Sequence, residues 1–212
     1  NKIKEYLSIT LLSFLISFYL FEIYQNNRNL EGQSIVYIKK IFNPKKFKNF
    51  DLRNAKEVVK DLRKENSEVY IVGINSEFYL TSEGQRIKPL SGLSNSLLVN
   101  CNENGYFSLF KSDRYGFNNP DSVWDQKNFQ FILLGDSFVQ GQCVNNEYNI
   151  DSEFRKINFN QTLNLGYGGH GPFMNYAKLK EYLDNEQIKI KNILWFYYEG
   201  NDLYDTTYEK ND

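Results

Sequence analysis

The chain has 212 residues, of which 41% are hydrophobic and 17% aromatic, and its formal net charge is −1. This composition supports a packed core and excludes a disordered chain. The 25 basic and 26 acidic residues are mixed, which argues against a nucleic-acid-binding surface. One Lys-rich stretch, residues 39–48, either contacts anionic head groups or, as is more common, forms a solvated helix face.

The N-terminal segment has the strongest apolar signal. Sixteen residues from Tyr6 to Phe21 carry no charge and are rich in Leu, Ile and Phe, and Ile23 and Tyr24 extend the stretch. A membrane span takes ~20 residues. We therefore expect residues 1–24 to form a transmembrane anchor, with a cleaved signal peptide as the main alternative and a buried core helix as the third. This predicts a single-pass membrane location with the soluble domain in the periplasm or outside the cell, although basic residues on both flanks leave the orientation open.

Two segments follow the anchor. Residues 25–66 are expected to be a juxtamembrane helical segment, because apolar residues repeat at helical spacing between Asn54 and Asn66. Residues 67–127 are expected to be a β-rich lead-in, with a strand at 68–72 and a hairpin turning at 82–84.

The end of the lead-in is aromatic and rich in turn residues. It runs from Lys111 to Trp124 and contains Arg-Tyr-Gly-Phe-Asn-Asn-Pro-Asp. The Asn-Asn-Pro-Asp part predicts a turn, and Phe117 and Trp124 are expected to anchor the segment against the core.

The most informative tripeptide ends an apolar run. Residues 131–134, Phe-Ile-Leu-Leu, lead into Gly135-Asp136-Ser137, and a polar, helix-compatible stretch follows. Strand ends in open α/β sheets face the crevice where ligands bind, which is where a nucleophile would lie. The alternative is a plain turn, because Gly, Asp and Ser are also common turn and cap residues.

Two later segments have the same strand-then-loop pattern. Residues 161–172 start as a short strand and continue into a loop with Gly166, Gly168, Gly169 and Gly171 before a helix that begins at Pro172. Residues 193–198 read as a strand buried on both faces that ends in Glu-Gly-Asn-Asp.

Strands alternate with helical stretches from residue 129 onward, near 153–157 and 174–183. This alternation predicts a parallel sheet with crossover helices. The expected fold class is therefore α/β, with a doubly wound parallel sheet in residues 128–212 preceded by the transmembrane helix and the β-rich lead-in.

Together, the three segments resemble short sequence blocks of the SGNH, or GDSL-type, serine hydrolase family. The resemblance covers residues 111–204, and it implies a flavodoxin-like hydrolase domain that is incomplete at its C-terminus. By motif, it implies that Ser137 is the nucleophile. It also implies an oxyanion hole made by the backbone N–H groups of Ser137 and Gly169 and the side chain of Asn201, which would stabilise the charge of a tetrahedral intermediate.

The general base is missing from this pattern. The family has a late Asp-x-x-His block, which these residues lack, and the chain has one histidine, His170, beside the implied oxyanion glycine. We expect His170 to line the loop or the substrate cleft, with a surrogate base as the alternative. We also expect the chain to be a fragment lacking both ends, and ester hydrolysis without the block to be inefficient.

The remaining candidate ligands and cysteines give weaker signals. Glu199 replaces the family's usual glycine, but its spacing to Asp202 and Asp205 matches no known metal loop, so no metal or cofactor is expected. The spacing of Cys101 and Cys143 permits a disulfide without requiring one, and we expect the two thiols to be unpaired.

The leading functional hypothesis is a serine esterase or acyltransferase-like enzyme that acts on acyl esters, with acylated envelope glycans as candidate substrates. The lipid bilayer is the second expected partner, and nucleic acid is not expected. The alternative is a non-catalytic anchored module that binds a glycan or a partner through aromatic side chains. The candidates for that surface are Tyr167, Trp195, Tyr197 and Tyr198.

Overall fold

A computed structural model describes residues 2–26, 49–73, 80–82, 85–157 and 161–209. The chain divides into two compact units, Asn1–Leu52 and Arg53–Asp212, and each unit is described by itself below.

The first unit contains one described helix, α1 (Lys2–Asn26). The large apolar side chains that the structure describes between Tyr6 and Phe21 are more than half exposed. Among the residues that the structure describes, no helix combines the length and the apolar character needed to cross a bilayer.

The prediction of a transmembrane anchor at residues 1–24 is therefore wrong, and the single-pass membrane location that was based on it is also wrong. The physical reason lies in the composition of the stretch. Its uncharged part is sixteen residues long, contains Ser and Thr, and is followed by Glu22, whereas a span takes ~20 predominantly apolar residues.

The second unit begins with α3 (Ala55–Leu62) and a small mixed sheet. A capping box starts α3: the Asn54 side chain accepts from Glu57 N, and the Glu57 carboxylate accepts from Asn54 N. Val58 and Val59 of this helix pack against Val69 and Val99 of the sheet. The sheet has the order β1-β4-β5, with β1 parallel to β4 and β4 antiparallel to β5, and a separate hairpin pairs β2 with β3. The strands are β1 (Val69–Ile71), β2 (Leu80–Ser82), β3 (Gln85–Ile87), β4 (Leu97–Val99) and β5 (Leu109–Lys111).

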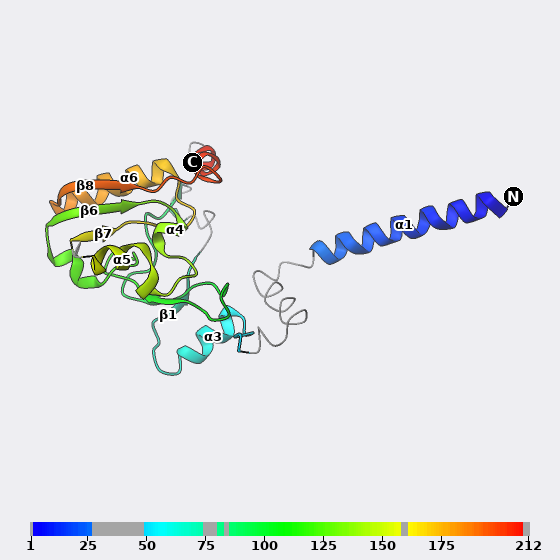
Figure 1. The fold of residues 1–212 in the computed structure, drawn as a ribbon, viewed down its shortest axis with the longest axis horizontal. Helices are drawn as coiled ribbons and strands as arrows, with labels where there is room; N and C mark the ends of the chain where they lie inside the picture. Colours follow the sequence, from blue (N-terminus) through cyan, green and yellow to red (C-terminus); the bar gives the residue numbers. More distant parts are fainter. Residues whose placement is uncertain (1, 27–48, 74–79, 83–84, 158–160, 210–212) are drawn as a thin grey trace. The chain divides into compact units, whose positions relative to one another are not determined.

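A second sheet is entirely parallel and has the order β7-β6-β8 (Figure 1). The central strand β6 (Asn128–Leu134) aligns Ile132 with Leu163 of β7 (Thr162–Asn164) and with Ile193 of β8 (Lys189–Trp195). Parallel neighbours end at the same edge, so the segments that follow the three strands lie close together in space. The connecting helices of this part of the chain are η1 (Asp121–Asp125), α4 (Ser137–Gln140), η2 (Asn146–Tyr148), α5 (Ile150–Lys156), α6 (Pro172–Glu186) and α7 (Asp202–Glu209).

The main core lies between this sheet, helix α6 and the end of the lead-in. Phe117 and Trp124 are almost fully buried and belong to one cluster with Ile132 and Leu163, and Tyr182 of α6 packs against them. The expectation that Phe117 and Trp124 anchor the lead-in is confirmed.

The predicted fold class needs correction. The described residues form mixed α/β structure whose sheets have at most three strands, and they contain no helix that could span a membrane. The described residues therefore form neither the expected doubly wound sheet nor a transmembrane helix before it. The strand patterns were local signals, and they did not determine how many strands would join one sheet.

The expectation that the two cysteines stay unpaired is also wrong. Cys101 and Cys143 form a disulfide with their Cα atoms 4.9 Å apart, across 42 residues of sequence. The left-handed backbone of Cys143 (φ 61°) and a hydrogen bond from Asn104 Nδ2 to Cys143 O at 3.4 Å help to bring the two segments together. This proximity is a tertiary effect that residue spacing does not reveal.

Candidate active site

Ser137 lies at the turn that follows β6. Glycine is required just before it, because a Cβ on Gly135 would lie 2.5 Å from Val139 Cγ2. Asp136 caps the short helix α4, since its Oδ1 accepts from Phe138 N at 3.0 Å. Ser137 is the first residue of α4 and is partly buried. Within the described part of the chain, its hydroxyl has no hydrogen-bond partner.

The glycine-rich loop after β7 satisfies its backbone donors almost completely. Gly166 N donates to Asn164 Oδ1, Tyr167 N to Gly135 O, Gly168 N to Gln140 Oε1, His170 N to Tyr167 O and Gly171 N to Glu209 Oε1. Gly169 N is the exception, because it donates to no acceptor among the described residues. Gly169 also has a left-handed backbone with φ 74°, which favours glycine.

The loop lies directly against the turn that carries Ser137. A Cβ on Gly168 would lie 3.7 Å from Ser137 Cβ, which is ordinary van der Waals contact. Gly166 approaches even more closely, since its Cβ would lie 2.5 Å from Gln140 N. The structure therefore brings the segments of Ser137 and Gly169 together, although 32 positions separate them in the sequence.

Asn201 reaches the same place from the end of β8. Its Nδ2 donates to Asp136 Oδ2 at 3.2 Å, which puts the amide beside the residue that precedes Ser137. An amide nitrogen carries two hydrogens, so one remains for a ligand. The Asn201 Oδ1 is buried and has no partner among the described residues.

These donors have a common chemical property. The backbone N–H groups of Ser137 and Gly169 and the amide of Asn201 come from three segments in contact, and both backbone donors have no acceptor within the described ranges. Donors held in place by a folded scaffold stabilise a developing oxyanion, each by ~3 kcal/mol. The arrangement can therefore stabilise negative charge beside a serine hydroxyl.

His170 does not take part in this arrangement. Its side chain is 2% exposed and packs on Tyr167, with ring centroids 4.8 Å apart. Burial and the nearby charges of Lys178 and Lys88 lower the pKa of His170 well below its usual range, while a hydrogen bond to the Pro89 backbone opposes this shift. A buried ring with a lowered pKa is a weak base, which fits the expected loop-lining role better than the role of a surrogate base.

A buried lysine lies beneath the loop. Lys178 of α6 is fully buried, and its Nζ donates to Leu165 O at 2.6 Å. Burial lowers the pKa of Lys178 to about 7, while Glu209 and Asp136 act in the opposite direction. Burial also disfavours the charged form of Glu209 and so raises its pKa. The Glu209 carboxylate accepts from Gly171 N and Phe173 N at the start of α6.

Of the acidic residues near the end of β8, Asp202 has a hydrogen-bond partner of its own. Asp202 Oδ2 accepts from Tyr198 N at 2.8 Å, and burial raises the pKa of Asp202 and Asp205. Among the described residues, no group of three or more His, Cys, Asp or Glu side chains is suited to hold a metal ion.

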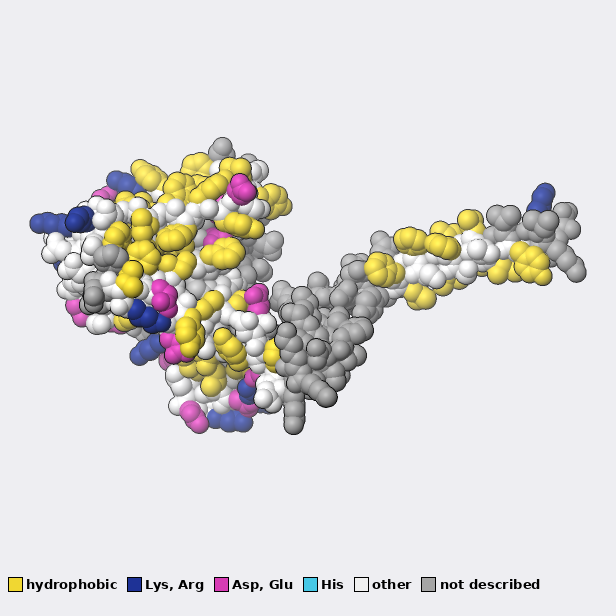
Figure 2. Space-filling model, in the orientation of Figure 1, with side chains coloured by type: hydrophobic (Ala, Val, Ile, Leu, Met, Phe, Trp, Pro, Cys, Tyr) yellow, Lys and Arg dark blue, Asp and Glu magenta, His cyan; other side chains and the backbone are white. Residues whose placement is uncertain are grey.

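The aromatic side chains of the alternative hypothesis differ in exposure. Trp195, Tyr197 and Tyr198 are 48–50% exposed, whereas Tyr167 is partly buried against His170. Figure 2 shows hydrophobic side chains gathered on the face of the second unit where Figure 1 has β6, β8 and α4. Phe138, which follows Ser137, is 61% exposed and contacts Tyr198 edge-on, with ring centroids 5.3 Å apart.

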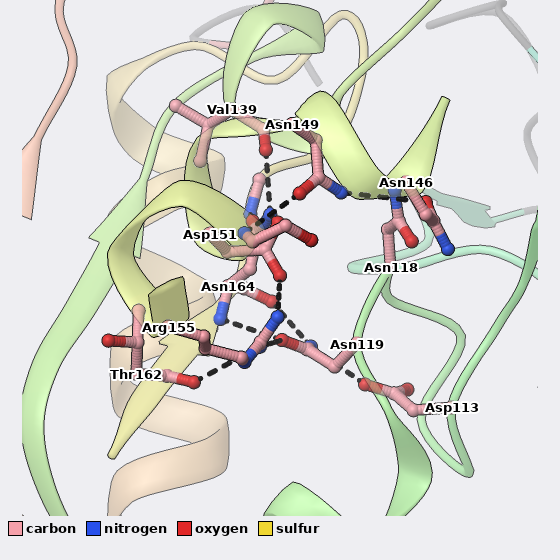
Figure 3. Close-up of polar contacts among 12 residues, drawn as sticks. Asp113, Asn118, Asn119, Val139, Asn146, Asn149, Asp151, Arg155, Thr162 and Asn164 are labelled. Carbon is pink, nitrogen blue, oxygen red and sulfur yellow. Dashed lines mark hydrogen bonds and ion pairs between the residues drawn. The ribbon is translucent and has the colours of Figure 1, made fainter. Parts of the chain in front are cut away.

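The contacts of several residues that hold the site together could not be identified from the sequence. Asp136 links Ser137 to Asn201, and Gln140 links α4 to Gly168. Asn164 lies in the middle of a polar network in Figure 3, where its Nδ2 donates to Val139 O at 2.7 Å and to Asp151 Oδ1 at 3.1 Å. Turn and cap residues look alike in sequence whatever they contact, so no sequence pattern marks these partners.

Comparisons of the chain with protein-family models, with curated proteins and with solved structures found no match. The function proposed below therefore depends on the geometry of the site and on the motif resemblance.

Proposed function

We propose that the chain carries the nucleophile and oxyanion hole of a serine esterase or acyltransferase-like enzyme of the SGNH type. Ser137 Oγ attacks the acyl carbon of an ester, a base accepts the serine proton, and the alcohol leaves with a proton. Transfer of the acyl group to water gives hydrolysis, and transfer to another hydroxyl gives acyl transfer. Acylated cell-envelope glycans are the candidate substrates.

The N–H of Gly169, which donates to no acceptor among the described residues, is the observation that best supports this proposal. Its five neighbours from Gly166 to Gly171 all donate to protein acceptors, and the loop touches the turn of Ser137. Backbone donors that are buried in folded proteins are nearly always paired. Gly169 is only partly buried, so its N–H is open to water or to a ligand. An open donor in this position, beside Ser137, suits an oxyanion-binding site.

A fluorophosphonate probe tests the proposal. Ser137 Oγ attacks phosphorus, fluoride leaves, and added imidazole accepts the serine proton, which supplies the base that the sequence motifs lack. We expect mass spectrometry to find the adduct on Ser137 and to find none in Ser137→Ala. Ser122→Ala is the matched control, because Ser122 is an exposed serine of η1. Unchanged labelling in Ser137→Ala, or no labelling at any imidazole concentration, would contradict the proposal.

The alternative function is glycan or partner binding without catalysis. It is favoured by the half-exposed Trp195, Tyr197 and Tyr198 at the end of β8, because aromatic side chains in strands are more often core. This function would be selected if the fluorophosphonate probe does not label the chain and the chain binds a glycan or a partner. That binding should be unaffected by Ser137→Ala and lost in Trp195→Ala.

A further inference from the structure

We infer that Gln140 is a positioning residue, which fixes the glycine-rich loop against the turn of Ser137 and so sets the distance between nucleophile and oxyanion donor. This inference rests on the function proposed above. Gln140 is the last residue of α4 and does not contact the reacting atoms in the proposed chemistry.

The contact itself is short and buried. Gln140 is 2% exposed, and its Oε1 accepts from Gly168 N at 3.0 Å. The contact joins two segments that are 28 residues apart. It also immediately precedes the one loop residue, Gly169, whose N–H has no acceptor in the described part of the chain.

The helix that carries Gln140 is itself held in place. A helix of four residues is not stable alone, so its carbonyl groups need partners from elsewhere. Asn164 Nδ2 donates to Val139 O at 2.7 Å, as Figure 3 shows. Asn118 Nδ2 donates to Gln140 O at 2.8 Å. Gln142 N donates to Ser137 O at 2.9 Å. These contacts fix the position of Gln140, so its Oε1 can hold the backbone of Gly168 in place.

Glycine allows the two segments to approach closely enough for this contact. A Cβ on Gly166 would lie 2.5 Å from Gln140 N, and a Cβ on Gly168 would lie 3.2 Å from Gln140 Oε1. The missing side chains of these glycines therefore allow the loop to approach α4, and the hydrogen bond from Gly168 N to Gln140 Oε1 fixes the loop in one position. Without the acceptor, Gly168 N would be free to turn, and the neighbouring donor of Gly169 would move relative to Ser137.

The chemical requirement on residue 140 is specific. It must offer an acceptor oxygen at the end of a side chain with two methylene groups. Gln140→Glu keeps both the length and the acceptor, Gln140→Asn shortens the side chain by one methylene, and Gln140→Leu removes the acceptor. Gln161→Leu is the matched control, because Gln161 is exposed before β7.

Two measurements test the inference. The first is the hydrogen-exchange protection of the Gly168 amide, followed by NMR, and the second is the rate of fluorophosphonate labelling of Ser137 in imidazole. We expect Gln140→Leu and Gln140→Asn to lose the protection and to label about 10- to 100-fold more slowly, as small misplacements of reacting groups do. We expect Gln140→Glu and Gln161→Leu to keep both properties.

Each outcome decides between the two proposals. Slow labelling in Gln140→Leu with intact Gly168 protection, or normal labelling with lost protection, would overturn the positioning role. The same is true if Gln140→Glu behaves like Gln140→Leu. Failure of the wild-type chain to label would refute the proposed function alone, and the Gly168 amide would then decide whether Gln140 fixes the loop. Gln140→Asn supplies the comparison if Gln140→Leu does not fold.

Discussion

The side-chain amide of Asn201 donates to the carboxylate of Asp136 at 3.2 Å. The other oxygen of Asp136 accepts from Phe138 N at 3.0 Å, so one carboxylate caps α4 and orients Asn201. Asp136 is 2% exposed, and solvent screens these contacts little. The residue next to the proposed nucleophile therefore couples two parts of the proposed oxyanion hole.

Because Asp136 orients Asn201, we expect the effects of Asp136→Asn and Asn201→Ala on the labelling rate of Ser137 to be non-additive. Asp136→Asn keeps the oxygen that caps α4 but replaces the acceptor of Asn201 with a donor. We expect each variant to slow labelling of Ser137, Asn201→Ala by about 10²- to 10³-fold. The double variant should be little slower than Asn201→Ala, because both changes act through one amide.

The matched control for this pair is Asn192→Ala. Asn192 is exposed in β8, and its Nδ2 donates to Gln130 O at 3.0 Å, so the variant removes a similar amide away from the turn. Labelling should be unchanged in this variant. Simple multiplication of the Asp136→Asn and Asn201→Ala effects would show that the two residues act independently.

The disulfide predicts a large effect of reduction on stability. It closes a loop of 42 residues, for which the loss of chain entropy in the unfolded state corresponds to about 4 kcal/mol. We expect a reducing agent to lower the free energy of unfolding of the wild-type protein by ~3–4 kcal/mol in urea titrations. The double variant Cys101→Ala/Cys143→Ala should show a similar loss and no response to the reducing agent. Equal stabilities with and without reductant would contradict this prediction.

The strand-and-loop segments of the sheet were predictable from sequence, whereas the contacts between them were not. The apolar run before Gly135 and the glycines after Leu165 indicate strand ends by themselves. The partners of Asp136 and Gln140 lie 65 and 28 residues away, and no local pattern identifies them.

Two predictions failed because each used a property of a short sequence segment to infer something that depends on the tertiary structure. The uncharged stretch at Tyr6–Phe21 is apolar, but it forms no helix of a kind that crosses a membrane within the described residues. The two cysteines looked unpaired because sequence separation was the only available guide, while the turn at Cys143 brings them together.

Lys178 predicts a pH dependence of stability. Burial lowers its pKa in the folded state to about 7, compared with 10.5 for an ordinary lysine. Between pH 7 and pH 10.5 the Lys178 side chain is protonated in the unfolded chain but not in the folded chain, and this difference favours unfolding. The stability associated with neutral Lys178 is therefore fully present above pH 10.5 and is lost as the pH falls toward 7. Lys178 should therefore make the free energy of unfolding rise by up to ~1.4 kcal/mol per pH unit.

Lys178→Met tests this contribution in urea titrations at pH 7, 8 and 9. We expect a shallower rise of stability with pH in this variant than in the wild type. Lys180→Met is the matched control, because Lys180 lies on the same helix, is 62% exposed and pairs with Asp184. Its slope should equal that of the wild type. Equal slopes in all three proteins would show that Lys178 keeps an ordinary pKa.

Because the loop packs closely against α4, we expect substitution by alanine to be tolerated poorly at Gly166 and well at Gly200. In Gly166→Ala the new Cβ would lie 2.5 Å from Gln140 N and 2.7 Å from Val139 C, and these backbone atoms cannot move without displacing the turn of Ser137. In Gly200→Ala the nearest atoms to the new Cβ would be those of the Tyr198 ring, which is 49% exposed and can rotate away. We expect Gly166→Ala to lower the free energy of unfolding by ~2–3 kcal/mol or more, and Gly200→Ala by less than ~1 kcal/mol. Urea titrations of both variants check this difference, and similar losses at the two positions would mean that the loop and α4 are not packed as closely as the structure indicates.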